Sequence, residues 1–238
     1  MKKENCNIIK ITSKKLNKPK SQKSMEYKNK AKIPNTYKKI GKIEPIYKGE
    51  TIYIIGGGPS LKDFNWTKLI SKRTIAVNKA FLFYPGADVL YWTDVRFYDW
   101  YEKEINEFKG LKVTNKNRPV RDDVINLLDT GRLGLDTNPS NIRHGSNSGY
   151  AAINLAVHLG AKTIVLLGFD MRMTGQRSHW HDGYTTPQNP TVYAQAMIPA
   201  FDTLVEPLRN LKIEVYNACP TSALNTFKKC SIDLSLTL

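Results

Sequence analysis

The sequence predicts a Rossmann-like, three-layer α/β sandwich with a mostly parallel sheet, preceded by a disordered basic arm. Short apolar segments alternate with helical segments from residue 51 to residue 216, which is typical of a parallel sheet covered by helices on both faces. Glycine-rich turns adjoin two of these segments, and the Lys-rich start of the chain has no periodic apolar pattern. We therefore expect an arm at 1–48 and a single Rossmann-like domain at 49–238.

The composition supports this division. The chain has 238 residues, 41% of them hydrophobic, which is enough to build a core of ordinary size. Its net charge is +15, but residues 1–50 alone hold 15 Lys against 4 Glu, a net +11, and contain no Arg, Phe or Trp. Such an arm could make weak contacts with nucleic-acid phosphates, or it could simply keep the chain soluble.

Apolar runs and cysteines indicate a cytoplasmic protein. No apolar run approaches the roughly 18 residues of a membrane span, and no apolar signal segment follows the start of the chain. The three cysteines (Cys6, Cys219 and Cys230) are odd in number and lack metal-ligand spacing. We expect reduced thiols, with neither a disulfide framework nor a zinc site.

The strands are predicted from short runs of β-branched and aromatic residues. The first, 51–55, reads Thr-Ile-Tyr-Ile-Ile, and the run at 162–167 is the most apolar in the chain. The expected strands are 51–55, 73–77, 88–92, 111–114, 162–167 and 212–216.

The helices are predicted from capping residues and amphipathic spacing. Ser60 followed by Asp63 resembles a capping box, and Gly160 would end an Ala-rich helix. The expected helices are one beginning at Ser60 and those at 97–108, 150–159 and 192–208, the last kinked at Pro199. Residues 115–145, rich in Asn, Asp, Gly and Pro, are expected to be irregular.

Polar residues follow several of these strands directly. Gly56–Ser60, Asn78, Asp94 and Asp170 each come after a predicted strand. Ligands of parallel sheets bind outside the carboxyl ends of the strands, so these residues are expected to rim one crevice.

Two glycine turns are the candidate phosphate sites. In the first, Gly56, Gly57 and Gly58 would let the backbone approach a ligand, and Ser60 would begin a helix whose dipole favours an anion. The second runs from Gly145 to Gly149. In it Ser146 and Asn147 could donate to phosphate or sugar while Ser148 caps the helix. The alternatives are a tight turn in the first case and plain N-capping in the second.

Asn78 and Asp94 are candidate nucleotide contacts. The Asn78 amide offers both a donor and an acceptor, which suits a base or a ribose. Asp94 could hold a ribose hydroxyl or a metal, or cap the next helix. Asp170 ends the most apolar strand, where a carboxylate is costly without a partner. It could act as a base, as a metal ligand, or as a group that orients a histidine.

Histidines supply the acid–base candidates, because imidazole titrates near neutral pH. His179 and His181 lie in a long polar loop after Asp170, and these three are the expected catalytic residues. A metal site with Asp182, or a loop simply anchored by Trp180, are the alternatives, and no metal site is predicted. His158 lies inside the Ala-rich helix and is expected to be structural. His144 and Arg143 are further candidates for a phosphate contact.

Four segments together carry a resemblance: Ile54–Lys62, Val77–Lys79, Asn147–Ala151 and Leu159–Asp170. Over about residues 51–220 the chain resembles the Rossmann-like superfamily of bacterial sialyltransferases that use CMP-sialic acid and of MptE-like 6-hydroxymethylpterin diphosphokinases. It looks closest to an uncharacterised, phage-encoded branch of that group.

The resemblance implies roles for particular residues. Gly57, Gly58, Ser60 and Asn78 would contact the nucleotide, as would Ser148 and Gly149, and His179 or His181 would be the catalytic base. The sialyltransferases carry Asn at the position of Gly57. They also have a Tyr where this chain has Met171 and Arg172, and Arg172 would offset the charge of a leaving phosphate.

These observations together lead to a functional expectation. We expect a nucleotide-dependent transferase of the glycosyltransferase kind that uses a CMP-, CDP- or UDP-linked donor. One alternative is an MptE-like diphosphokinase that uses ATP and Mg²⁺, with Asp94 or Asp170 as metal ligands. The other is a non-catalytic phage accessory protein that keeps a nucleotide-binding fold.

Overall fold

The computed structural model confirms the predicted fold class. It describes residues 40–94, 96–115, 121–173 and 190–238. In these residues one sheet has eight strands, and every pair of neighbours is parallel. The strands are β1 (Thr51–Ile55), β2 (Arg73–Val77), β3 (Val89–Trp92), β4 (Leu111–Thr114), β5 (Val124–Asn126), β8 (Thr163–Leu167), β9 (Glu214–Asn217) and β10 (Lys228–Lys229).

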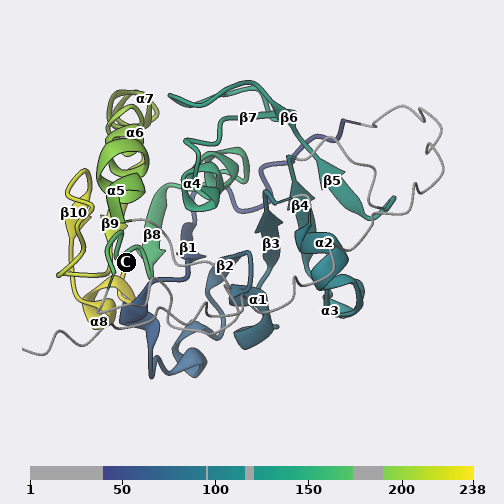
Figure 1. Cartoon of the computed structure of the whole chain (residues 1–238), viewed down its shortest axis with the longest axis horizontal. Helices are drawn as coiled ribbons and strands as arrows, with labels where there is room; N and C mark the ends of the chain where they lie inside the picture. Colours follow the sequence, from purple (N-terminus) through teal and green to yellow (C-terminus); the bar gives the residue numbers. More distant parts are fainter. Residues whose placement is uncertain (1–39, 95, 116–120, 174–189) are drawn as a thin grey trace, which may run out of the picture. The chain divides into compact units, whose positions relative to one another are not determined.

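The strand order reverses direction at β1. The order across the sheet is β10-β9-β8-β1-β2-β3-β4-β5 (Figure 1). The chain runs outward from β1 to β5, returns across the sheet, and enters β8 on the other side of β1. Such a switch point leaves a crevice at the carboxyl ends of the two central strands, and the candidate site lies there.

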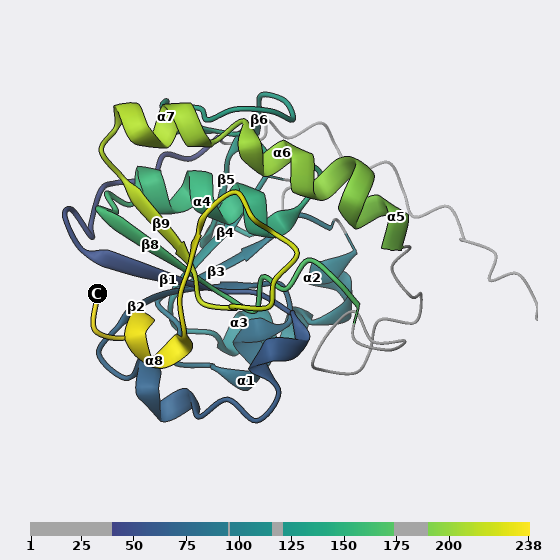
Figure 2. The same ribbon diagram turned by 90° about the vertical axis from the view of Figure 1, so that its left-hand side faces the viewer.

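Helices cover both faces of the sheet, as Figure 2 shows. On one face lie α4 (Ser148–His158), α6 (Ile198–Asp202) and α7 (Val205–Asn210). The other face carries α1 (Ala80–Phe83), α2 (Phe97–Trp100), α3 (Glu102–Glu107) and α8 (Ile232–Ser235). None of the described helices has the length and apolar character needed to cross a membrane.

Alternation along the strands builds a core on each face. Ile52 and Ile54 of β1 belong to the core that contains α4, whereas Tyr53 and Ile55 belong to the core under α1 and α2. Because both faces are covered, the strands are apolar throughout, and this is the pattern from which the sequence predicted them.

Two predicted helices are interrupted. The helix expected at 97–108 is divided into α2 and α3 at Tyr101, whose φ of −128° is not helical. The helix expected at 192–208 begins as α5 (Pro190–Val192), passes through a π-helical turn, η3 (Tyr193–Met197), and continues as α6 and α7. The irregularity therefore precedes Pro199, which sits in the first turn of α6.

The region 115–145 contains more structure than predicted. It supplies β5, the edge strand of the main sheet, and a small ribbon made by β6 (Leu128–Asp129) and β7 (Asn141–Ile142). Its short strands are too brief to give a periodic signal. The sequence also did not predict β10 or α8.

The helix predicted to begin at Ser60 is absent. Two short 3-10 turns, η1 (Pro59–Leu61) and η2 (Trp66–Leu69), take its place. Asp63 adopts a left-handed φ of 65°, which a capping box does not allow. The first glycine turn therefore does not present a helix dipole to a ligand.

The folded domain begins before residue 49. Ile43 is only 1% exposed and belongs to the core, and Ile40 pairs with Asn126 of β5. The Tyr47 backbone N–H donates to the Leu159 carbonyl (2.9 Å). Residues 40–48 thus belong to the domain rather than to the predicted arm, and 1–39 lie outside the described residues.

Candidate functional site

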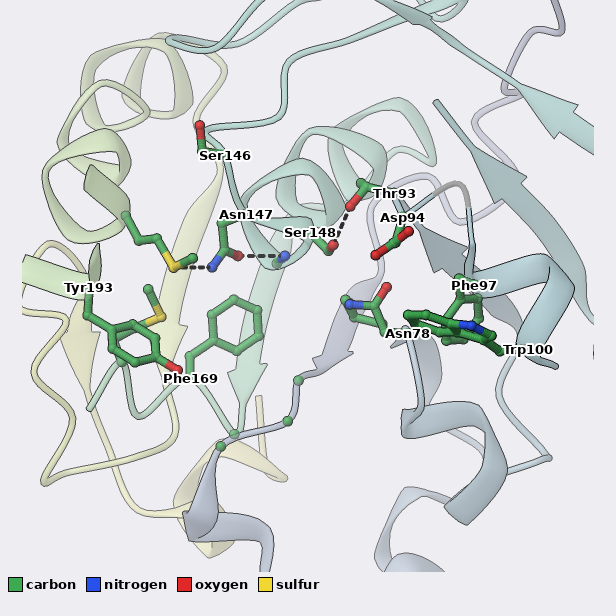
Figure 3. A pocket seen from close by; sticks show the side chains of 18 residues that line it. Asn78, Thr93, Asp94, Phe97, Trp100, Ser146, Asn147, Ser148, Phe169 and Tyr193 are labelled. Carbon is green, nitrogen blue, oxygen red and sulfur yellow. Dashed lines mark hydrogen bonds between the residues drawn. The ribbon is translucent and has the colours of Figure 1, made fainter. Parts of the chain in front are cut away.

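The two glycine turns converge on one cleft at the switch point (Figure 3). Its volume is about 280 Å³, just below the range of small-molecule sites, about 300–1,000 Å³. Every nucleotide-binding residue expected from the sequence lines the cleft except Ser60. Those residues are Gly56, Gly57, Gly58, Asn78, Asp94, Ser146, Asn147, Ser148 and Gly149.

Backbone hydrogen bonds attach the first glycine turn, which follows β1, to the end of β8. The Gly56 N–H donates to the Leu167 carbonyl (2.8 Å), and the Gly58 N–H donates to the Gly168 carbonyl (2.8 Å). A Cβ on Gly58 would overlap both the Asp170 carboxylate and the Gly168 carbonyl. Glycine is therefore required here by close backbone approach, and the bare backbone of the turn forms one wall of the cleft.

Asp170 is bound to the first glycine turn. Its side chain accepts hydrogen bonds from the Ser60 N–H (2.9 Å) and the Ser60 hydroxyl (2.7 Å), and the residue is 3% exposed. The Ser222 hydroxyl supports the strand end by donating to the Phe169 carbonyl (2.6 Å). Neither Asp170 nor Ser60 lines the cleft, so their carboxylate and hydroxyl hold the turn instead of facing a ligand.

The second glycine turn begins α4. Asn147, not Ser148, caps the helix, because its side chain accepts from the N–H groups of Gly149 (2.7 Å) and Tyr150 (3.1 Å). The Ser148 hydroxyl is instead 2.6 Å from that of Thr93, at the end of β3. The predicted capping role of Ser148 is thus wrong. Its bond to Thr93 joins α4 to the opposite wall.

Ser146 lines the cleft in a strained conformation, with φ of 58°. The ring of His144 supports it, because Nδ1 accepts from the Ser146 N–H (2.9 Å). That bond requires the proton on Nε2, which lies 3.7 Å from the Asp129 carboxylate. His144 therefore supports the turn from behind and does not line the cleft itself.

One end of the cleft is polar and aromatic. Asn78 follows β2 with a left-handed φ of 51°, and its Oδ1 has no hydrogen-bond partner within the described part of the chain. Asp94 follows β3 and pairs with Arg96 through Oδ2 and Nη2 (2.8 Å). Phe97 and Trp100, from α2, complete this end (Figure 3).

The other end of the cleft is apolar. Phe169 and Met171 come from the segment after β8, and Tyr193 and Met197 come from the π-helical turn. The Asn147 Nδ2 lies 3.3 Å from the Met197 sulfur, which links this end to the second glycine turn (Figure 3). Single π turns inside helices often occur at functional sites.

The remaining predicted site residues do not line the cleft. Arg172 is exposed and is not among the lining residues. His179 and His181 lie outside the described residues. His158, as expected, is structural. It is buried in α4 beside the Asn141 carbonyl (2.9 Å), and desolvation by burial lowers its pKa.

The carboxylates proposed for Mg²⁺ do not fit a metal site. Asp94 has both of its oxygens hydrogen-bonded to Arg96, and Asp170 has both of its oxygens hydrogen-bonded to Ser60. Within the described ranges, no three His, Cys, Asp or Glu side chains cluster as metal ligands.

Sequence reasoning missed about half of the lining. The Thr93 contact could have been found, since it adjoins Asp94 at a strand end, and Phe169 likewise adjoins Asp170. Tyr193 and Met197 were not singled out, because the helix expected at 192–208 gave no indication of which of its sides faces the cleft.

Comparison of the chain with protein-family models, with curated proteins and with solved structures returned no match.

Proposed function

We propose that the chain is a nucleotide-dependent transferase of the glycosyltransferase kind, with the nucleotide of an activated donor bound in the cleft. The observation that carries the proposal is the convergence of two side-chain-poor turns on one cavity at the switch point of a parallel sheet. In such folds this is where phosphates and nucleotides bind.

The phosphate would lie between the two turns. α4 has 11 residues, and its first turn borders the cleft, so its dipole favours a negative charge there. Gly56–Gly58 supply a wall without side chains, across which a phosphate can approach the backbone. When the Thr93 hydroxyl donates to Ser148, the Ser148 hydroxyl keeps its own proton to donate to an oxygen of the ligand.

The proposed step moves a glycosyl group to an acceptor hydroxyl. The acceptor oxygen bonds to the anomeric carbon as the bond from that carbon to the donor phosphate oxygen breaks. The nucleotide leaves with that electron pair, and a histidine accepts the hydroxyl proton. His179 or His181 is proposed for this role on the sequence alone, and Asp170, bound to Ser60, is better suited to holding the turn.

There are two alternatives. An MptE-like diphosphokinase would need Mg²⁺, and the two carboxylates suggested for it already hold Arg96 and Ser60. A non-catalytic phage accessory protein with the same cleft would bind a nucleotide without turning it over.

Thermal shift of the full chain tests nucleotide binding. The probes are CMP, CDP, UDP and ATP, each with and without Mg²⁺. A ligand at a hundredfold excess over its Kd adds about 2.7 kcal/mol, which is about 5–10 °C in Tm for a domain of this size. No response to any probe would contradict the proposal.

A matched pair of variants tests whether the thermal shift arises from binding in the cleft. Asn78→Gly removes the amide at a position with positive φ and should reduce the nucleotide shift. Ser71→Gly makes the same backbone change at an exposed position outside the cleft, where φ is 66°, and should leave the shift intact. An equal reduction of the nucleotide shift in both variants would show that Asn78 does not contact the nucleotide.

Turnover separates an enzyme from a binding protein. Hydrolysis of CMP-, CDP- and UDP-linked sugars is compared among the wild type, His179→Ala and His181→Ala. The rate of hydrolysis should fall by about 100-fold or more in at least one variant if a histidine serves as general base. Unchanged turnover in both would exclude histidine from the mechanism, and binding without turnover would favour the accessory protein.

A further inference from the structure

Trp100 stands out among the residues of the cleft. It is a large aromatic residue from α2 that borders the cavity and is nevertheless 54% exposed. Its neighbour Phe97 also borders the cavity but is buried, packing against Trp92 and Tyr101. Trp100 is thus an aromatic residue of this wall that is not packed into the core.

A chain of contacts holds the indole in place. Asp94 accepts hydrogen bonds from the Arg96 backbone N–H (2.8 Å), Nε (3.1 Å) and Nη2 (2.8 Å). The Arg96 guanidinium, which these bonds hold, lies 4.9 Å from the centroid of the Trp100 ring. A flat cation on one face orients the ring and leaves the opposite face for a second flat partner. Asp94 therefore acts on Trp100 through Arg96.

Asn78 supplies hydrogen-bonding capacity at the same end. Asn78 and Trp100 both line the polar end of the cleft (Figure 3). The Oδ1 of Asn78 is buried and lacks a partner among the described residues, and an unpaired buried acceptor is costly. An aromatic platform beside an amide with a donor and an acceptor suits a flat heterocycle with a polar edge.

We propose that Trp100 is the platform on which the nucleobase of the ligand stacks, while Asn78 contacts the edge of the base. The inference rests on the proposed function and extends it. The phosphate lies between the glycine turns, and the base lies at the Trp100 end of the cleft. Trp100 is a binding residue here, and Asp94 and Arg96 are positioning residues that hold its ring.

Calorimetric titration of the full chain tests this assignment. The probes are CMP, UMP, AMP and GMP, compared with ribose 5-phosphate, which carries the same phosphate but no base. The proteins are the wild type, Trp100→Leu, Trp100→Phe and the control Phe83→Leu, which changes another exposed aromatic side chain outside the cleft. Melting curves confirm that each variant is folded.

Stacking of a base is worth about a 5- to 150-fold change in affinity. Trp100→Leu should weaken the best nucleotide by that factor and leave ribose 5-phosphate unchanged. Trp100→Phe should restore most of the loss, and Phe83→Leu should behave as the wild type. Arg96→Gln should weaken the nucleotide by a smaller factor, because the ring stays but loses its support.

The contrary outcomes are distinct. If Trp100→Leu weakens ribose 5-phosphate as much as the nucleotide, the residue is merely structural and the assignment is refuted. If the wild type binds nucleotides and ribose 5-phosphate equally, the base makes no contact and the assignment is again refuted, while the proposed phosphate site survives. If neither class of probe binds, the proposed function itself fails and the assignment fails with it.

Discussion

The bond between Asp170 and Ser60 gives the sharpest prediction about how the first glycine turn is held. The two side chains lie 110 positions apart in the chain and join the end of β8 to the residues after β1. If the carboxylate is a support for the turn, its removal should cost folding stability. If it is a catalytic group, its removal should cost turnover in a protein that remains equally stable.

The geometry sets the expected magnitudes. Each hydrogen bond to a charged group contributes about 1.5–3 kcal/mol, so Ser60→Ala should lower the free energy of unfolding by that amount. Asp170→Ala removes both bonds and should cost about 3–6 kcal/mol. Asp170→Asn should cost only about 1–2 kcal/mol, because its amide oxygen can accept from the Ser60 N–H while its NH₂ donates to the hydroxyl.

Urea unfolding followed by circular dichroism measures these differences through the midpoint and the slope. A double-mutant cycle between Ser60→Ala and Asp170→Ala isolates the hydroxyl bond, and its coupling energy should be about 1.5–3 kcal/mol. A coupling below about 0.5 kcal/mol would refute the structural reading. So would an Asp170→Asn variant with wild-type stability and no turnover.

Three further predictions concern the turns and α4. Gly58→Ala should destabilise far more than Gly86→Ala, because the added Cβ overlaps Asp170 at the first site and has no neighbour closer than 3.8 Å at the second; equal melting temperatures would contradict this. Asn147→Ala should lower stability by about 0.5–2 kcal/mol through loss of the α4 cap, and urea unfolding measures it. Burial lowers the pKa of His158 below its ordinary 6.5. Between the two pKa values the unfolded chain therefore binds more protons than the folded chain. Stability should therefore be full above about pH 6.5 and fall as the pH drops, and His158→Gln should flatten the profile; an unchanged profile would show that His158 does not contribute.

Much of the sheet was predictable because each central strand is covered on both faces. The strands β1, β2, β3 and β8 are continuous apolar runs bounded by turn residues, and the predicted ranges match them closely. The grouping of Asn78 and Asp94 at one edge followed from the rule for the carboxyl ends of parallel strands.

The first glycine turn shows what local reasoning could not predict. Ser60 has the chemistry of an N-cap, but a buried carboxylate 110 positions away binds it instead. That tertiary contact overrides the local preference for a helix. Ser148 was misassigned for a similar reason, because the side chain of the preceding residue, Asn147, reaches the free amides first.

Two residues at the apolar end of the cleft, Tyr193 and Met197, could not be predicted from the sequence. Tyr193 and Met197 are separated by four positions, so they lie on one side of the helical segment. They belong to a π-helical turn, and both line the cleft. A pattern based on the period of 3.6 residues carries no information about such a turn.

Nuclear magnetic resonance of the ¹⁵N-labelled full chain tests the central claim most directly, since the amide signals of the two turns report on them separately. The chain is titrated with whichever of CMP, CDP, UDP and ATP gives the largest thermal shift. The amides of Gly56–Gly58 and of Ser148–Gly149 should shift together and fit a single Kd. Shifts confined to one turn, or two different dissociation constants, would contradict a shared ligand.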